Sequence, residues 1–257
     1  MGILRLTFLG TGTSMGIPTL SCDCCVCRSP DPRDERTRAS LLLNYDGHTI
    51  VIDTSPDFRL QALRANLLHV DAVLYTHPHA DHILGLDDLR PFSLKQGQPI
   101  PLYANRETLD AIRRTFSYAF GHSTPFSIVP QVRLEQIDGP FELFSLRFEP
   151  LPVLHGTMEV LAYRFASAAY VTDFSQIPPA SQQQLHGLDV LILDALRHRP
   201  HPTHSSLAES LALVRELQPR RAYFTHICHD LPHADTNAQL PAGVELAYDG
   251  LAVEVEV

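Results

Sequence analysis

Short apolar stretches separated by turn residues dominate the hydrophobic pattern, which is typical of strands. Two such stretches, residues 40–45 and 48–53, flank Asp46-Gly47, the sequence signal of a tight β-hairpin. Further strands are predicted over residues 4–9, 70–76, 141–148, 159–165, 168–172, 189–193 and 221–225, and strand-like alternation returns within 244–257.

Helical spacing of apolar residues is less frequent along the chain. It predicts helices over residues 61–68, 83–89, 105–116 and 205–217, whereas the aromatic and proline-bearing segment 117–130 is expected to be irregular. Strands come first in pairs and then alternate with helices, which favours a layered α/β sandwich. Because no repeat or linker divides the chain, we expect residues 1–257 to form a single domain.

Composition narrows the class of protein. Among the 257 residues, 44% are hydrophobic and 19% are charged, which excludes a disordered chain. No apolar run approaches the ~18 residues of a membrane span, and no secretory signal is visible, so we expect a cytoplasmic protein with no membrane partner. The net charge of −9 argues against a nucleic-acid polymer as partner.

The 14 histidines are more informative because several lie where strands are predicted to end. The motif H-x-H-x-D-H brings four potential ligands together directly after the strand 70–76, at a point where a helix is expected to follow. At such a turn the ligands can converge on two neighbouring points, which suits two metal ions. Further histidine and aspartate side chains follow later predicted strands. In open α/β sheets, bound molecules and ions lie at the carboxyl ends of the strands, so these side chains are candidate metal ligands as well. The combined set is His77, His79, Asp81, His82, His155, Asp173 and His226.

A second metal site is predicted in a cysteine-bearing loop at about residues 21–38. Cys22, Cys24 and Cys27 form C-x-C-x-x-C, and three thiolates need a fourth ligand to complete a tetrahedral structural zinc site. His229, three residues after His226, is a good candidate for that ligand. A shifted register that uses Cys25 remains open.

With these motifs the chain resembles the metallo-β-lactamase-fold hydrolases. The resemblance implies a four-layer αββα sandwich with a dinuclear metal site at one edge. It also implies ligand roles: His77, His79 and His155 on the first metal, Asp81, His82 and His226 on the second, and Asp173 bridging the two. Asp53, at the end of the hairpin strand, matches an acidic residue that supports the histidine motif from behind.

The cysteine loop and the pair His226 and His229 narrow the resemblance to the phosphodiesterases that act on phosphoribosyl 1,2-cyclic phosphate in the carbon–phosphorus lyase pathway. This implies a phosphoric diester hydrolase in which hydroxide shared by two divalent ions (Zn²⁺, Mn²⁺ or Fe²⁺) attacks a small, cyclic phosphodiester. Asp81 and Asp173 are expected in the catalytic site, and His204 is expected to assist catalysis, although His198 and His201 occupy the same loop. Related enzymes also suggest a homodimer.

Three other interpretations share the fold. They are a tRNA 3′-processing nuclease, a thioester hydrolase, and a non-hydrolytic protein of cofactor biosynthesis or binding such as that of the pyrroloquinoline quinone pathway. The acidic charge and the lack of a Lys/Arg-rich insertion weigh against the nuclease. The complete H-x-H-x-D-H motif weighs against the non-hydrolytic protein, and a count of bound metals would separate it from the phosphodiesterase.

Overall fold

The computed structural model describes residues 2–121 and 128–257, and these residues form two seven-stranded sheets. Within the predicted insertion 117–130, residues 122–127 lie outside the described residues. The first sheet has the order β14 (Ala252–Glu256), β1 (Ile3–Gly10), β2 (Ser40–Tyr45), β3 (His48–Ile52), β4 (Ala72–Leu74), β5 (Ile100–Ala104) and β6 (Val132–Gln136). The second has the order β13 (Val244–Leu246), β12 (Arg221–Thr225), β11 (Val190–Asp194), β10 (Ala168–Val171), β9 (Met158–Phe165), β8 (Leu146–His155) and β7 (Phe141–Leu143).

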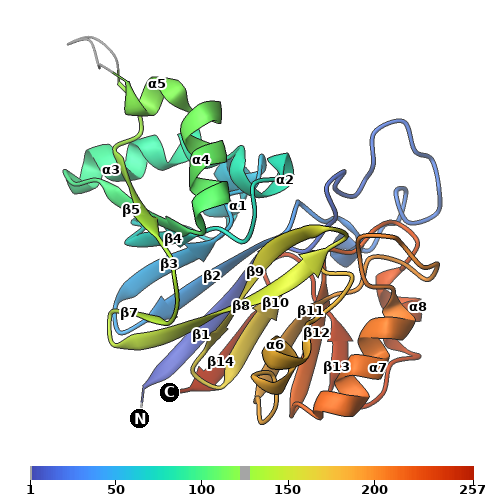
Figure 1. Ribbon diagram of the computed structural model, residues 1–257. Coiled ribbons are helices and arrows are strands. Elements are labelled where there is room, and N and C mark those ends of the chain that lie inside the picture. The colour runs from blue at the N-terminus through green and yellow to red at the C-terminus, as the bar shows by residue number, and fades with distance from the viewer. Residues whose placement is uncertain (1, 122–127) are drawn as a thin grey trace.

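The two sheets follow similar pairing rules. Strands β3 to β6 pair in parallel and β14 to β3 antiparallel, while β10 to β13 pair in parallel and β7 to β10 antiparallel. Strands β1 and β14 pair with each other, so the two chain ends lie side by side (Figure 1).

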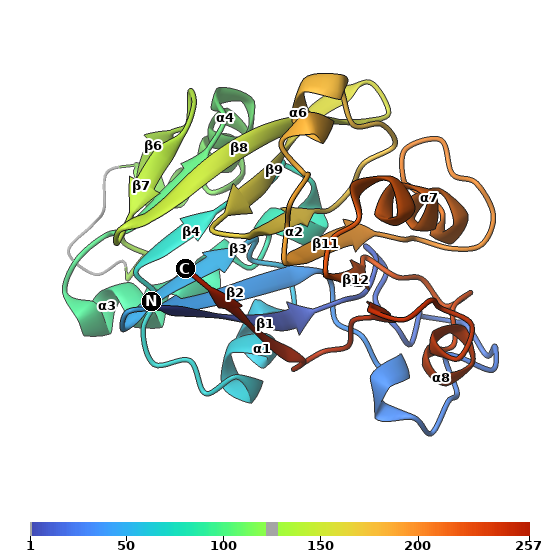
Figure 2. The ribbon, with the colours of Figure 1, turned by 90° about the horizontal axis from the view of Figure 1, so that it is seen from below.

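Helices cover the outer face of each sheet. Figures 1 and 2 place α1 (Phe58–Arg64), α2 (Ala80–Ile83), α3 (Arg90–Gln96), α4 (Arg106–Thr115) and α5 (Ser117–Phe120) with the first sheet. On the other side lie α6 (Pro179–Gln183), α7 (Leu207–Leu217) and α8 (His233–Asn237). Short 3₁₀ turns occupy η1 (Pro32–Asp34) and η2 (Leu86–Leu89).

Side-chain alternation along the strands explains the layers. In β2, Leu41 and Leu43 join the core between the sheets, whereas Leu42 packs under the helices of the first sheet. In β11, Ile192 faces the central core and Leu191 faces the helices of the second sheet. Each buried strand therefore contributes to two cores, because successive side chains point to opposite faces. The predicted four-layer αββα sandwich is confirmed.

Several predicted boundaries are wrong for local reasons. The helix expected over 83–89 is divided into α2 and η2, because the chain passes so close to residue 55 at Gly85 that an added Cβ would lie 2.0 Å from the Ser55 carbonyl oxygen. The single strand expected over 141–148 is the hairpin of β7 and β8, which turns at Phe144 and Ser145, both with positive φ. The helix expected over 61–68 is α1, which begins and ends earlier.

Among the described residues, no helix is both long and apolar enough to cross a bilayer.

Candidate metal centre

The side chains of the predicted dinuclear site come from chain segments that follow strand ends. Asp53 follows β3, Asp173 follows β10 and His226 follows β12, and the backbone of all three has positive φ, at 63°, 53° and 55°. Left-handed backbone is disfavoured for residues other than glycine, at a cost of about 1–3 kcal/mol each. Its recurrence at one edge of the sandwich marks the place where the fold tolerates strain to orient side chains.

The structure brings the predicted ligands together in two groups. The first group is His77, His79 and His155, and the second is Asp81, His82, Asp173 and His226. Within each group the ligand atoms lie within 4.8 Å of one another. The Asp173 carboxylate reaches both, with Oδ2 3.9 Å from His77 Nε2, Oδ1 3.4 Å from His82 Nε2 and Oδ2 3.3 Å from His226 Nε2. This is the position that a bridging carboxylate requires.

Hydrogen bonds behind the ligands fix which imidazole nitrogen faces inward. His82 Nδ1 donates to Asp53 Oδ2 over 2.8 Å, and fully buried Asp53 also accepts from the backbone N–H and hydroxyl of Thr76. His155 Nδ1 donates to the Thr203 carbonyl oxygen over 2.8 Å. Both contacts leave Nε2 free to bind metal, as supporting groups of metal-binding histidines usually do.

The protonation states also fit divalent ions. Burial lowers the pKa of His77 well below its ordinary value, which keeps the imidazole neutral. Burial alone would raise the pKa of Asp173, but the charges of His226 and His82 hold it well below its usual range. Burial by itself would lower the pKa of His82, as it does for His77. The nearby carboxylates, first of all Asp173, outweigh burial and raise the pKa of His82 well above its ordinary value. The carboxylates around His82 therefore favour a positive charge, which a divalent ion would supply in place of the imidazole proton, because metal binds the neutral imidazole and the ionised carboxylate.

Unpartnered nitrogen atoms give a direct test of this fit. Nε2 of His77, His82 and His226 is buried without a hydrogen-bond partner within the described residues. Such orphaned polar atoms are costly unless something binds them. The seven residues thus fit a pair of divalent metal ions.

The cysteine cluster is separate from this centre. The sulfur atoms of Cys22, Cys24 and Cys27 lie 3.3, 3.6 and 3.3 Å from His229 Nδ1, and Cys25 is exposed outside the group. Backbone N–H groups of Thr19 and Cys27 donate to the sulfur atoms of Cys27 and Cys24. Three sulfurs and one imidazole suit a closed tetrahedral zinc site, in the register that contains Cys24.

Among the three histidines of the loop after β11, His204 is the one next to the predicted metal centre. Its ring stacks on His226 with 4.8 Å between centroids, and its Nδ1 lies 3.8 Å from Asp173 Oδ2. His201 lies one ring further out, 5.1 Å between centroids from His204, and His198 is exposed.

Sequence reasoning missed Asp194. It is fully buried at the end of β11, and its Oδ2 accepts a hydrogen bond from His204 Nδ1 over 2.8 Å. Its Oδ1 lies 3.9 Å from His226 Nδ1. The signal that could have found it is its place after the apolar run 190–193, the same position that the predicted ligands occupy after their strands.

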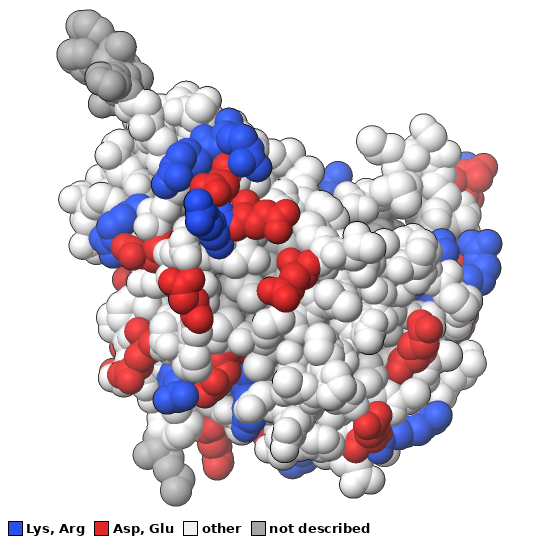
Figure 3. All heavy atoms as spheres, viewed as in Figure 1, with Lys and Arg blue, Asp and Glu red and all other residues white. Residues whose placement is uncertain are grey.

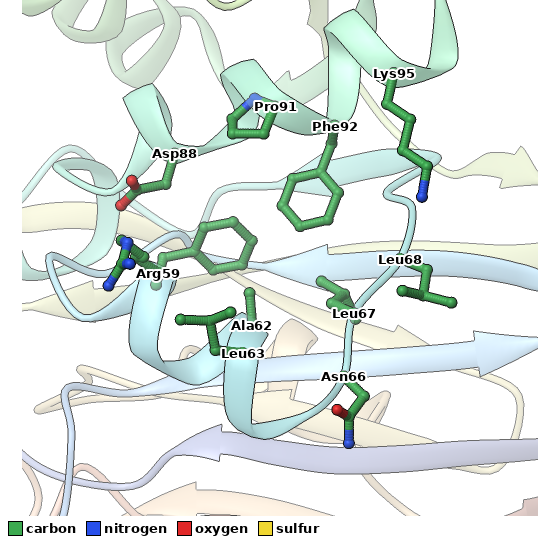
Figure 4. A pocket seen from close by; sticks show the side chains of 11 residues that line it. Arg59, Ala62, Leu63, Asn66, Leu67, Leu68, Asp88, Pro91, Phe92 and Lys95 are labelled. Carbon is green, nitrogen blue, oxygen red and sulfur yellow. The ribbon is translucent and has the colours of Figure 1, made fainter.

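A wider groove lies elsewhere on the molecule. It measures about 420 Å³ between α1 and α3, and its lining is largely apolar, with Phe58, Leu63, Leu67 and Phe92 from the two helices and their flanks (Figure 4). No predicted site residue lines it. The groove is therefore separate from the candidate metal centre. A smaller cavity lies beside that centre and is lined in part by His204.

Fold, ligand groups and supporting hydrogen bonds together define a metal-dependent hydrolase of the metallo-β-lactamase fold. The chain belongs to the β-lactamase superfamily, whose domain matches residues 48–227. Within that superfamily it is PhnP-like: it is 52% identical to a crystal structure described as a new diphosphatase from the PhnP family, with a TM-score of 0.93 over 98% of this chain and 97% of that one.

The chain is also similar to two other proteins. It is 37% identical over 258 residues to an octanoyltransferase of Porphyromonas gingivalis, covering 98% of this chain and 52% of the relative, so the chain spans about half the length of that protein. Zinc-bound PqqB from Methylobacterium extorquens superposes with a TM-score of 0.81 over 97% of this chain and 99% of that one, at 21% identity. The second likeness is one of fold alone.

Proposed function

We propose that the protein is a metal-dependent phosphodiesterase that hydrolyses a small phosphodiester, with a cyclic phosphate as its substrate. The observation that carries the proposal is the pair of ligand groups joined by the Asp173 carboxylate. Two adjacent ions can hold both the attacking and the leaving oxygen of an in-line displacement at phosphorus. The likeness to a PhnP-family diphosphatase supports phosphoryl chemistry.

Each ligand group has a distinct task in this proposal. His77, His79 and His155 hold one divalent ion, and Asp81, His82 and His226 hold the other, with Asp173 between them. Bound divalent ions supply Lewis acidity toward a phosphoryl oxygen and make water acidic enough to serve near neutral pH. Asp53 keeps His82 oriented, and the cysteine cluster with His229 holds a structural zinc that anchors its loop.

His204 is the residue that we propose acts on the substrate itself. With His204 Nδ1 donating to the Asp194 carboxylate, Nε2 remains for the substrate. From there the imidazole can hydrogen-bond a phosphoryl oxygen or pass a proton to the leaving oxygen. Asp194 is thus a positioning residue that fixes the tautomer and orientation of His204.

A second candidate substrate is a diphosphate. It is favoured by the diphosphatase that is 52% identical to this chain. A diphosphate linkage and a cyclic diester present the same phosphorus centre, so the roles given above serve either. A tRNA nuclease is less well supported, because acidic and basic side chains are interspersed on the face drawn in Figure 3 and no broad basic area covers that face.

The test separates binding of metal from catalysis. His204→Gln should lower kcat for 2′,3′-cyclic nucleotides or bis(p-nitrophenyl) phosphate by ~10²–10⁴, with the metal content unchanged. Asp173→Ala should lose both activity and metal, because its carboxylate serves both groups. Asp194→Asn should lower kcat with little change in KM or in metal content, since the neutral amide no longer supplies the negative charge that holds His204 Nδ1 as a donor.

His186→Gln, on the exposed surface, is the matched control and should leave activity unchanged. Equal loss of metal from His204→Gln and Asp173→Ala would contradict this division of roles. A wild-type protein that carries its metals but hydrolyses only phosphomonoesters would contradict the proposed reaction.

A further inference from the structure

A threonine comes immediately before a predicted metal ligand at three strand ends. The pairs are Thr76 and His77 after β4, Thr172 and Asp173 after β10, and Thr225 and His226 at the end of β12. All three threonines are fully buried. Because a buried hydroxyl nearly always has a hydrogen-bond partner, the contacts of each one indicate what it contributes to the metal centre.

The hydroxyl of Thr76 lies between the two ligand groups. Its Oγ1 is 2.8 Å from Asp53 Oδ2 and 2.9 Å from His77 Nδ1. The same Asp53 Oδ2 accepts from His82 Nδ1 over 2.8 Å, and Asp53 Oδ1 accepts from the backbone N–H of Thr76 over 2.8 Å. One hydroxyl and one carboxylate therefore connect His77, in the first ligand group, with His82, in the second.

The directions of these hydrogen bonds follow from the nitrogen that is open to metal. His77 Nε2 is buried without a hydrogen-bond partner within the described residues and lies 3.9 Å from Asp173 Oδ2. A neutral imidazole carries one proton, so that proton is on Nδ1 when Nε2 binds a metal ion. Nδ1 then donates to Thr76 Oγ1, and the hydroxyl hydrogen is directed to Asp53 Oδ2. The Thr76 hydroxyl thus holds His77 in the tautomer that metal binding requires.

Support for the first ligand group comes from few contacts. His155 Nδ1 donates to the Thr203 carbonyl oxygen over 2.8 Å, and the ring of His79 has no hydrogen-bond partner in the part of the chain that the structure describes. In the second group, His82 donates to Asp53 directly and would keep that bond without the Thr76 hydroxyl. Loss of the hydroxyl should therefore affect the ion held by the first group more than the other ion.

The other two threonines provide an internal comparison. Thr172 Oγ1 donates to Oδ1 of its neighbour Asp173 over 2.6 Å. Thr225 Oγ1, in contrast, is buried without a hydrogen-bond partner among the described residues. Thr225 thus matches Thr76 in residue type, in burial and in its place before a metal-binding histidine, but lacks the contact.

We propose that Thr76 is a positioning residue of the metal centre, whose hydroxyl orients His77 for the first ion and shares Asp53 with His82, a ligand of the second. The inference rests on the dinuclear centre of the proposed function and is independent of which substrate is hydrolysed. Removing a partner that orients a metal-binding histidine typically weakens metal affinity about 10–100-fold. The hydroxyl therefore makes a contribution that metal binding itself can report.

Chelator competition on the metal-loaded protein tests the proposal. Wild type and variants are equilibrated with increasing concentrations of a chelator, and the metal that each protein retains is measured by elemental analysis. Thr76→Val, which replaces the hydroxyl with a methyl group, should bind one active-site ion about 10–100-fold more weakly. Thr76→Ser keeps a hydroxyl and should retain its metals as wild type does.

Thr225→Val is the matched control. It makes the same exchange at a buried threonine before His226, where the hydroxyl has no hydrogen bond within the described residues to lose. Its metal affinity should equal that of wild type. Unchanged affinity in Thr76→Val, a loss as large in Thr225→Val, or a loss in Thr76→Ser as large as in Thr76→Val would overturn the proposal.

A measurement on the wild type tests the same contact if Thr76→Val does not fold. Nitrogen-15 NMR of the zinc-loaded protein should show that His77 Nδ1 carries a proton that exchanges slowly with solvent, and a His77 protonated on Nε2 would overturn the inference. Wild type that retains one zinc ion on the cysteine cluster and no others would overturn the proposed dinuclear centre and this inference with it. Wild type with both active-site ions, and equal metal affinity in Thr76→Val, would overturn this inference and leave the proposed function intact.

Discussion

Arg36 and His233 form a buried polar pair that links the segment before β2 to α8. Arg36 is 1% exposed, and its Nη2 donates to His233 Nδ1 over 3.1 Å. The backbone N–H of His233 donates to the Asp34 carboxylate over 2.8 Å, and the His233 ring packs edge-on against Tyr248. A permanently charged donor on Nδ1 requires that His233 be neutral in the folded protein.

This pair predicts a component of acid sensitivity. Burial, with the charges of Arg36 and Arg33, lowers the pKa of His233 from 6.5 to about 4. Between these values the unfolded chain binds a proton that the folded protein excludes, so the contribution is complete above pH 6.5 and is lost as the pH falls toward 4. The loss amounts to at most about 3 kcal/mol.

This pH dependence can be checked by measuring the free energy of unfolding in denaturant for wild type and His233→Gln between pH 6.5 and 4. The free energy of unfolding of the variant should fall less steeply with acid, because glutamine has no proton to take up. His186→Gln, exposed, should follow the wild-type curve. Parallel slopes for His233→Gln and wild type would rule out this role.

Single residues differ in how far sequence could place them. His77, Asp173 and His226 could be placed because each carries a ligand atom and ends a recognisable apolar run. Asp194 ends such a run too, but a lone aspartate there is as often a turn residue, and only the fold brings it against His204. Arg36 could not be placed, since its sequence surroundings are those of an exposed loop and its burial depends on α8.

The long loop between β1 and β2 is ordered by two kinds of contact. At its base, Asp249 accepts from the backbone N–H groups of Thr11 and Thr37, and Gly12 pairs with the chain near residue 38. At its tip, only a small apolar cluster of Ile17, Val26 and Cys27 accompanies the sulfur ligands within the described residues. We therefore expect the tip to depend on metal binding, because so few buried groups cannot offset the entropy of ordering it.

Removing one sulfur ligand should release the tip. Cys27→Ser is expected to lose about one metal ion per chain and to become sensitive to trypsin at Arg28, whose side chain is 69% exposed, while the dinuclear centre keeps its metals. Elemental analysis and limited proteolysis measure both effects. Cys25→Ser, outside the cluster, is the control. Metal loss from Cys25→Ser as complete as from Cys27→Ser would show that the ligand register is wrong.

Elements with continuous apolar runs, such as β2, β3 and β9, could be located from sequence, because side chains on both faces of these strands are buried in cores. Strands β5 and β6 and helices α3, α5, α6 and α8 were not predicted, and α5 lies at the start of the segment 117–130 that was expected to be irregular. Their hydrophobic patterns are too short or too mixed to distinguish a strand or helix from a loop, and packing in the fold determines their structure. Strand β6, for example, has no fully buried residue. The break between α2 and η2 depends on the close approach at Gly85, a tertiary contact that local pattern does not encode.

At the scale of the molecule, the metal centre requires both halves of the sandwich. The first sheet supplies Asp53 and the H-x-H-x-D-H motif after β4, and the second supplies His155, Asp173 and His226. The two sheets have similar strand order and direction, so the carboxyl ends of their parallel strands meet at one edge. Sequence could predict this layering through alternation and resemblance, whereas the cavity beside His204 arises from three distant loops.

The most direct test of the central claim is elemental analysis of the purified protein, run alongside turnover of bis(p-nitrophenyl) phosphate and 2′,3′-cyclic nucleotides. We predict about three metal ions per chain, two in the dinuclear centre and one on the cysteine cluster, together with phosphodiester cleavage and no action on phosphomonoesters. About one zinc ion per chain without turnover would leave the fold intact and contradict the proposed function.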